Sequence, residues 1–404
     1  MAGHICNYVY QIVMGRMLTE EDYGTLNALF ALLTIASVPG LAIALVVSKY
    51  IAGYNATGEQ FKIGLFLRKM LFYVSIFTAV VIALGLVFAQ LISSYLMVDN
   101  IFHVVLIITS IALTLLLPIS TGAVQGLKWF WDLGLLNLVT PVARLLLGIL
   151  LVYLGFRLDG ALGALAAGNL LAVLIGFIIL RDKFKVFGPN IALGRREAIG
   201  YAMPVLIVTF CISVLTNIDM LMIKHYFSPQ ESGLYGAAVI FGRAIYYFPM
   251  AITMAMFPLA AEAKALKTDA YGSLKKALLY SAVLCGLGVL ALNLFPEIII
   301  NLLFGDRYLP AVHYIRLVSL AMFPLCLLSI IANFNLAINK VKLTIWSLAI
   351  GSIAEYFLIL KYHATISQVL YVLMGVGLVL LIANFSGTML RKPDREMEKV
   401  YSGM

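Results

Sequence analysis

Long, uninterrupted apolar runs are the feature that most limits what this chain can fold into. They recur along the whole sequence in lengths of about 20 residues or more, enough for a helix to cross roughly 30 Å of hydrocarbon. Because the runs are continuous and do not alternate with polar residues, they exclude a membrane-spanning barrel. A composition of 63% apolar and 12% charged residues also lies far from that of a soluble domain. The sequence therefore predicts an all-α polytopic membrane protein.

The apolar runs define twelve predicted membrane-spanning helices. Their approximate bounds are 1–15, 24–48, 70–97, 101–124, 132–155, 160–180, 198–223, 233–260, 275–304, 309–337, 341–360 and 365–390. The first run is short for a helix that crosses a bilayer. An even number of spans places both termini on the same side of the membrane.

The basic residues between the runs indicate which side that is. With a cytoplasmic amino terminus, the outer loops hold five of the 28 Lys and Arg residues and three lie inside spans, which leaves 20 on the cytoplasmic side. Such an excess is typical of cytoplasmic loops. We therefore expect a multi-pass protein of the cell (cytoplasmic) membrane with both termini in the cytoplasm. Because the basic residues form no stripe, the net charge of +9 does not indicate a nucleic-acid partner.

A weak internal repeat divides the chain into halves. A shift of 209 residues places Leu18–Gly24 on Phe227–Gly233, and each segment is an acidic turn between apolar runs. Six spans per half insert in the same direction, which predicts two lobes related by a pseudo-two-fold axis along the membrane normal. The predicted domains are an N-terminal lobe at 1–180, a cytoplasmic linker at 181–197, a C-terminal lobe at 198–391 and a cytoplasmic tail at 392–404.

Several short motifs, in this order, resemble one family of membrane exporters. They are GRMLTEEDYG at 15–24, GLAIA at 40–44, SKYIA at 48–52, NID at 217–219, GLY at 233–235, FP at 257–258 and LLFGDRYLPA at 302–311. Over nearly the whole chain the sequence is similar to the polysaccharide and oligosaccharide-lipid flippases of the multidrug/oligosaccharidyl-lipid/polysaccharide (MOP) exporter superfamily. The resemblance implies a MATE-like fold of two six-helix lobes around a central cavity, and export of a lipid-linked glycan by alternating access.

The resemblance leaves alternative functions open. A cation-coupled multidrug or small-amphiphile antiporter has the same fold and the same number of spans. Lipid II flippases usually carry fourteen spans, so twelve argues mildly against that branch. A non-transporting membrane scaffold for glycan synthesis is a third class. The expected partners are a lipid-linked glycan, membrane lipids, a coupling H⁺ or Na⁺, and a glycan polymerase or glycosyltransferases.

Three arginines lie inside predicted spans, where a permanently charged guanidinium needs water, a carboxylate or a phosphate beside it. These are Arg144, Arg243 and Arg316. In the flippase hypothesis they line a cationic cavity that binds the diphosphate of a polyprenyl-linked sugar, because a guanidinium fork matches phosphate oxygens. The alternative is an ion pair with Asp219 or Glu355, or a side chain that reaches the membrane interface.

Polar residues inside the seventh and eleventh spans are candidates for coupling or gating. Asp219 and Asn217 lie on a polar face of the seventh span, and Glu355 lies deep in the eleventh. Asn7 and Gln11 are a weaker counterpart in the first span. Each acid could bind a coupling H⁺ or Na⁺. Asp219 could equally be a helix-end residue beside Lys224, and Glu355 a partner in a structural pair.

Prolines at matching positions of the two halves predict helix kinks. Pro39 with Gly40 lies in the second span and Pro249 in the eighth, where a proline frees a carbonyl and bends the helix. Such bends suit a rocking gate, and ordinary static kinks are the alternative. The five histidines and four cysteines are scattered singly, so we expect no metal site and no cofactor. Without a phosphate-binding loop or a catalytic triad pattern, we do not expect an enzyme.

Overall fold

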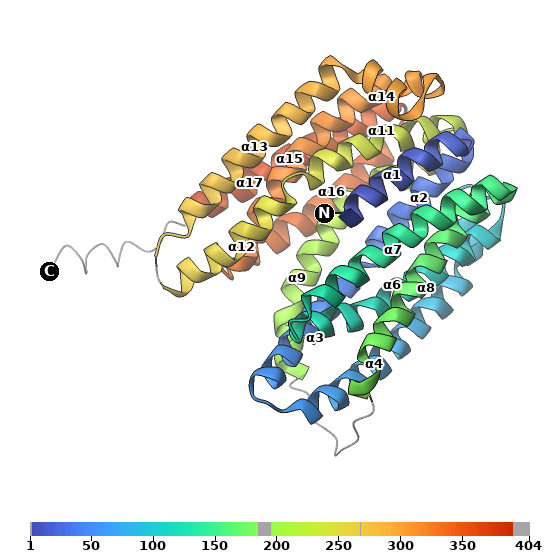
Figure 1. Cartoon of the computed structure of the whole chain (residues 1–404). Helices are drawn as coiled ribbons and strands as arrows, with labels where there is room; N and C mark the ends of the chain where they lie inside the picture. Colours follow the sequence, from blue (N-terminus) through green and yellow to red (C-terminus); the bar gives the residue numbers. More distant parts are fainter. Residues whose placement is uncertain (1, 185–194, 267, 391–404) are drawn as a thin grey trace, which may run out of the picture. The chain divides into compact units, whose positions relative to one another are not determined.

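The computed structural model describes residues 2–184, 195–266 and 268–390, and the regular structure in these residues is helical. Figure 1 shows the helices as long rods joined by short turns. Their bounds are α1 Ala2–Met17, α2 Glu20–Ala36, α3 Val38–Ala56, α4 Gln60–Val87, α5 Ala89–Tyr95, α6 Ile101–Gly126, α7 Phe130–Leu151, the π-helical segment η1 Val152–Phe156, α8 Arg157–Phe184, α9 Arg195–Leu215, α10 Ile218–Tyr226, α11 Pro229–Tyr247, α12 Met250–Ala265, α13 Tyr271–Leu294, α14 Pro296–Phe304, the 3₁₀ segment η2 Asp306–Ala311, α15 Val312–Ala337, α16 Lys342–Lys361 and α17 Ile366–Leu390. The predicted tail at 392–404 and residues 185–194 of the predicted linker lie outside the described residues.

Grouped across their breaks, these helices form the twelve predicted spans. Pairs of consecutive segments make up several of them: α2 with α3, α4 with α5, α9 with α10, α11 with α12, α13 with α14, and η2 with α15. Within the described residues, 10 stretches are long and apolar enough to cross a membrane. One of them, Phe130–Phe184, contains both α7 and α8, and the 16-residue α1 is shorter than the others. The all-α polytopic fold is thus confirmed.

Polar or proline-containing positions mark the breaks in the second, seventh and eighth spans. The second span breaks at Ser37, and Pro39 lies in the first turn of α3, where its missing N–H costs no hydrogen bond. The eighth span breaks between α11 and α12, and Pro249 is the residue that precedes α12. The seventh span breaks at Thr216 and Asn217. Whether the proline breaks move during transport remains a prediction.

The chain forms two compact units whose boundaries differ in part from the halves of the sequence. The first unit holds Met1–Leu206 with two short segments of the second half, Met220–Ala237 and Asn301–Tyr308. The second holds Ile207–Asp219, Ala238–Ile300 and Leu309–Met404. The lobe boundaries expected from the repeat remain a prediction.

Each unit has its own helix packing and its own apolar core. In the first unit α7 packs on α8, α3 and α8 pack on α6, and α1 packs on α7; in the second, α13 and α17 pack on α15, and α16 packs on α17. Val47, Phe66 and Ile119 are central to a core in the first unit, and Phe334 and Ile331 to one in the second.

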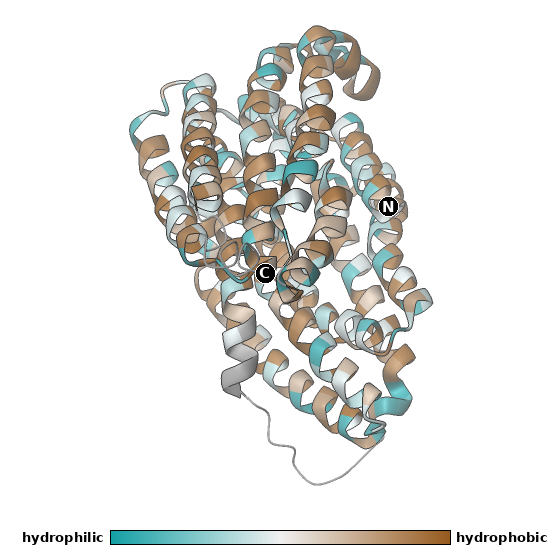
Figure 2. Cartoon of the chain, turned by 90° about the vertical axis from the view of Figure 1, so that its left-hand side faces the viewer, coloured by the Kyte–Doolittle hydropathy of each residue, from teal (hydrophilic) through white to brown (hydrophobic). Residues whose placement is uncertain are grey.

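The outward faces of the helices are also apolar, as a protein solvated by lipid requires. Hydrophobic residues extend along the helices in Figure 2. Trp131, Tyr153 and Leu287 are 93%, 81% and 61% exposed. Exposed apolar side chains on this scale would be a liability in water and are stable in hydrocarbon or at its interface.

Candidate substrate and coupling sites

Arg144 lies in the first unit, in a cluster of polar and aromatic side chains. It is 8% exposed, and its guanidinium carbon lies 4.8 Å from the centre of the Tyr10 ring and 5.1 Å from that of Phe30. One guanidinium nitrogen, Nη2, donates a hydrogen bond to the side-chain oxygen of Asn7. Ring faces and an amide oxygen stabilise a buried cation without a counter-charge, and each ring contributes about 0.5–2 kcal/mol.

One glycine and one long-range hydrogen bond hold this cluster in place. The Tyr10 hydroxyl donates to the Ala161 carbonyl at 3.0 Å, which fixes the ring between α1 and α8. A Cβ at Gly148 would lie 2.7 Å from the Tyr10 ring, so only glycine lets α7 approach α1 this closely. Asn7 and Tyr10 are three residues apart on α1 and therefore face the same neighbour. The polar face predicted for the first span thus contacts an arginine.

Arg243, in α11 of the second unit, has a different environment. Its Nε and Nη2 atoms are buried and have no hydrogen-bond partner among the described residues. The Tyr247 side chain, one helical turn further on, lies close enough to interact with its charge. No carboxylate of the described chain forms an ion pair with Arg243. A buried donor without a partner costs about 1–3 kcal/mol, so this arginine destabilises the described structure.

Arg316, also in the second unit, is exposed on the second turn of α15. Its carbonyl accepts a hydrogen bond from Ser319 at 2.8 Å. The three predicted arginines therefore occupy three environments: Arg144 is buried and hydrogen-bonded, Arg243 is half-buried with two nitrogens that lack a described partner, and Arg316 is exposed. Their assignment to substrate binding stays a prediction.

Asp219 and Glu355 lie in the same unit, and their carboxyl groups interact electrostatically. Both residues are 0% exposed, and neither oxygen of Glu355 has a hydrogen-bond partner in the described structure. Asp219 is in the first turn of α10 and Glu355 is in α16. Two buried acids that interact inside a membrane protein form a binding site, and they bind a proton or a small cation much more tightly there than they would in water.

A side-chain hydrogen bond near this pair joins α16 to α9, the helix that ends at the break in the seventh span. Ser352 donates to the Cys211 carbonyl in α9 at 3.2 Å. At the break itself, the Asn217 amide donates to the Ser213 carbonyl at 2.9 Å and to the Thr216 hydroxyl at 3.0 Å. The Asn217 side chain therefore donates hydrogen bonds to one carbonyl and one hydroxyl acceptor at the end of the broken helix. Its predicted role in coupling or gating is untested.

Several residues that shape these sites had no role in the sequence-based hypotheses. Tyr10 and Phe30 surround Arg144, and Ser352 links α16 to α9. Lys224, which the sequence suggested only as a neighbour of Asp219, is 2% exposed and interacts electrostatically with Glu21, Asp99 and Asp22. The available signal for this last group was a lysine directly after an apolar run, with acids in other loops.

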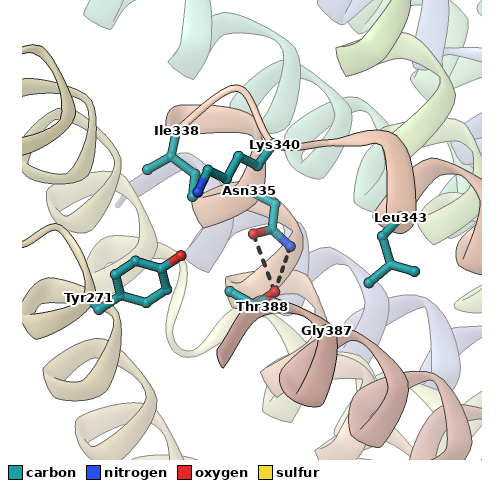
Figure 3. A pocket seen from close by; sticks show the side chains of 7 residues that line it. All are labelled: Tyr271, Asn335, Ile338, Lys340, Leu343, Gly387 and Thr388. Atoms are coloured by element: carbon teal, nitrogen blue, oxygen red, sulfur yellow. Dashed lines mark hydrogen bonds between the residues drawn. The ribbon is translucent and has the colours of Figure 1, made fainter. Parts of the chain in front are cut away.

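A small hollow lies at the end of α15 that is predicted to face the cytoplasm. Figure 3 shows its lining, in which Asn335 and Thr388 exchange hydrogen bonds of 2.9 and 3.3 Å. Tyr271, Ile338, Lys340, Leu343 and Gly387 complete it. None of the predicted site residues lines this hollow. Within the described residues there is also no group of three or more His, Cys, Asp or Glu side chains that could hold a metal ion.

Comparison with known proteins places this fold among membrane exporters. Residues 1–264 match the family model for polysaccharide biosynthesis proteins, and residues 204–360 match the MatE model. An uncharacterized membrane protein of Methanocaldococcus jannaschii is 22% identical over 402 residues, which cover 94% of this chain and 91% of that protein.

Two solved structures show the same fold at low sequence identity. One is an inward-facing multidrug resistance MATE family transporter of the MOP superfamily, with a TM-score of 0.78, 12% identity and coverage of 96% of this chain and 94% of that chain. The other is the lipid II flippase MurJ in an inward closed conformation, with a TM-score of 0.71, 14% identity and coverage of 96% and 87%. The expected MATE-like fold is confirmed, and the chain belongs to the polysaccharide biosynthesis protein family within the MOP superfamily of flippases and exporters.

Proposed function

We propose that this protein moves a polyprenyl-diphosphate-linked oligosaccharide from the cytoplasmic to the outer leaflet of the cell membrane by alternating access, for polysaccharide biosynthesis. The sugars and diphosphate would cross through the protein while the polyprenyl tail stays in the bilayer. Both termini would lie in the cytoplasm. The family match supports the substrate class, and the fold supports the mode of transport.

The observation that supports an anionic substrate most directly concerns the half-buried Arg243, whose Nε and Nη2 atoms are buried and have no hydrogen-bond partner among the described residues. A diphosphate would give its Nε and Nη2 donors the charged acceptors that the described residues do not provide. Because such a site must also release its cargo, one unpaired arginine is better suited than one already held by Asn7 and two rings. We therefore assign substrate contact first to Arg243, and regard Arg144 and Arg316 as secondary candidates.

The membrane potential favours this direction of transport. Moving one negative charge from a negative interior to the outside yields about 2.3 kcal/mol per 100 mV. A diphosphate carries more than one such charge, so the potential alone supplies a useful driving force. The interacting acids Asp219 and Glu355 would then bind a coupling H⁺ or Na⁺ that resets the protein.

Replacement of Arg243 by alanine in cells that depend on this protein for surface glycan tests the proposal. We expect export of the glycan to fall at least tenfold and the lipid-linked precursor to accumulate. The matched control is Lys361→Ala, which removes a cation that we expect on the outer side and whose Nζ lies 5.4 Å from the centre of the Tyr362 ring. Full glycan export by Arg243→Ala, at a normal protein level, would remove Arg243 from the substrate site.

The second candidate is a cation-coupled antiporter of small cationic amphiphiles. The buried pair of Asp219 and Glu355 favours it, because two acids could exchange H⁺ for a cationic drug. This function predicts drug sensitivity when the gene is deleted and no change in lipid-linked glycans. The flippase proposal predicts that deletion of the gene changes the lipid-linked glycans and causes no drug sensitivity.

A further inference from the structure

The two repeat-related acidic turns begin their helices with the same local structure. Thr19 precedes α2 and accepts a hydrogen bond from the Asp22 N–H at 3.2 Å. Ser228 precedes α11 and accepts one from the Glu231 N–H at 3.3 Å. Each is a hydroxyl cap three residues ahead of an acid in the first helical turn, which satisfies an otherwise open backbone donor.

These two turns also contact each other within the first unit. A Cβ on Gly24 would lie 2.4 Å from the Ser232 hydroxyl oxygen and 2.8 Å from the Gly233 nitrogen. A Cβ on Gly233 would lie 2.1 Å from the Glu20 carbonyl oxygen. Ser232 is 0% exposed. Gly24 and Gly233 are equivalent positions of the repeat, and each permits a backbone approach that any other residue would block.

Two arginines in this unit each bind carbonyls at the end of a helix from the other half of the sequence. Arg16, near the end of α1, donates through Nε to the Leu303 carbonyl at 2.8 Å and through Nη2 to the Leu302 carbonyl at 2.5 Å, both in α14. Arg307, in η2, donates to the Gly15 and Leu18 carbonyls at 2.8 Å. Carbonyls at a helix C-terminus have no partner within the helix and attract cations.

An aromatic cluster fills the space beneath these hydrogen bonds. The ring centres of Tyr23 and Phe304, and of Tyr23 and Tyr308, are 6.0 Å apart, and those of Phe304 and Tyr308 are 5.4 Å apart. A Cβ on Gly15 would lie 2.4 Å from the Phe304 ring. The rings, the glycines and the arginines thus form one continuous contact, which we name the outer seam: residues 15–24, 232–233 and 302–308.

The composition of the first unit shows how extensive this contact is. Its two segments from the second half of the sequence, Met220–Ala237 and Asn301–Tyr308, include the parts of the outer seam that lie beyond residue 206. Both segments are expected on the outer side of the membrane. An exporter that works by alternating access must part its halves at this end in every cycle.

We propose that the outer seam is the outer gate of the exporter, held closed by the reciprocal pair Arg16 and Arg307 and closed tightly because Gly15, Gly24 and Gly233 carry no side chain. This inference rests on the proposed transport cycle. Because four of its hydrogen bonds end on backbone carbonyls, the latch does not depend on a titrating group. Arg307 also forms an ion-pair contact of 3.8 Å with a Glu20 carboxylate oxygen.

Thiol labelling at Ser232 tests the gate independently of any substrate. In a variant whose native cysteines are replaced, Ser232→Cys places a thiol in the closed seam, and a membrane-impermeant maleimide is added outside intact cells. We expect slow labelling in this background and at least tenfold faster labelling once Arg16→Ala and Arg307→Ala are added, because two charge-assisted pairs of bonds are lost. Lys361→Ala is the control and should label at the background rate.

Labelling at the background rate in the double arginine variant would overturn the proposal. If that variant does not accumulate, Gly15→Ala provides the test: its methyl group collides with Phe304, so labelling should accelerate, and Phe304→Ala added to it should restore slow labelling. Unchanged labelling in Gly15→Ala would also overturn the gate. The flippase proposal can fail separately. In that case labelling still responds to the substitutions as expected, but the unsubstituted protein exports no glycan.

Discussion

Replacing the buried Arg144 and the half-buried Arg243 by methionine should have opposite effects on stability. Methionine keeps much of the side-chain length and removes the charge. In Arg243→Met the change eliminates two buried donors without partners, each costing about 1–3 kcal/mol, so the free energy of unfolding should rise by about 2–6 kcal/mol. With an unfolding entropy of about 2.1 cal/mol/K per residue over 404 residues, the unfolding temperature should rise by about 2–7 °C.

Arg144→Met should instead destabilise the protein. It removes a charge-assisted hydrogen bond to Asn7, about 1.5–3 kcal/mol, and two ring contacts of about 0.5–2 kcal/mol each. Relief of the one buried donor without a partner, Nε, returns only about 1–3 kcal/mol. We expect the free energy of unfolding to fall by about 1 kcal/mol or more.

Thermal unfolding in one detergent, followed by fluorescence, measures both effects, and glycan export is assayed in parallel. We predict that Arg243→Met is more stable and inactive, because a guanidinium that lowers the free energy of unfolding is retained for its function. We predict that Arg144→Met is less stable. Shifts of the same sign in the two variants would refute the reasoning, as would a stabilised Arg243→Met that still exports glycan normally.

Further predictions concern the acid pair, the helix packing and a surface contact. Glu355→Gln should remove the dependence of export on an H⁺ or Na⁺ gradient, measured with and without a protonophore or external Na⁺; a retained gradient dependence would exclude Glu355 from coupling. Gly148→Ala should push the Tyr10 ring off Arg144 and lower the unfolding temperature by several degrees, whereas Gly134→Ala on the same helix, with open space at its Cβ, should not. A hydrogen bond from Lys62 lowers the pKa of the half-exposed Glu59 carboxyl, so this contact gives a small stabilisation above the ordinary carboxyl pKa, which is lost as the pH falls through the lowered value. Because both side chains are partly solvated, Glu59→Gln should lower the unfolding temperature at pH 7 by about 1 °C or less, and a larger shift would contradict that.

Much of the fold followed from the sequence because a bilayer permits few solutions. Runs of apolar residues must be helices there, and their number and order gave the twelve spans. The break at Thr216 and Asn217 was missed because it carries no proline or glycine; its side chains hold the open helix end by bonds of their own. Helix breaks of this kind depend on pairings that hydropathy does not reveal.

The sites were harder to predict because they join residues far apart in the sequence. Arg144 and Asn7 were both recognisable as polar residues in apolar spans, yet nothing in the sequence paired them across 137 positions. The internal repeat identified Leu18–Gly24 and Phe227–Gly233 as equivalent turns. It could not show that Gly24 and Gly233 would approach each other's turn, because equivalence in a repeat specifies similar structure and not contact.

Transbilayer movement of the substrate by the purified protein is the decisive measurement for the proposed flippase function. The protein is reconstituted into vesicles that contain a polyprenyl-diphosphate oligosaccharide, and the fraction of glycan open to an added glycosidase is followed over time. We predict that vesicles with the unsubstituted protein expose nearly all of the glycan to the glycosidase. Vesicles with Arg243→Met should stay at the level of protein-free vesicles, and a transmembrane potential should accelerate the movement. Exposure no greater than in protein-free vesicles, from the same preparation that transports a cationic dye against a proton gradient, would contradict the proposed function.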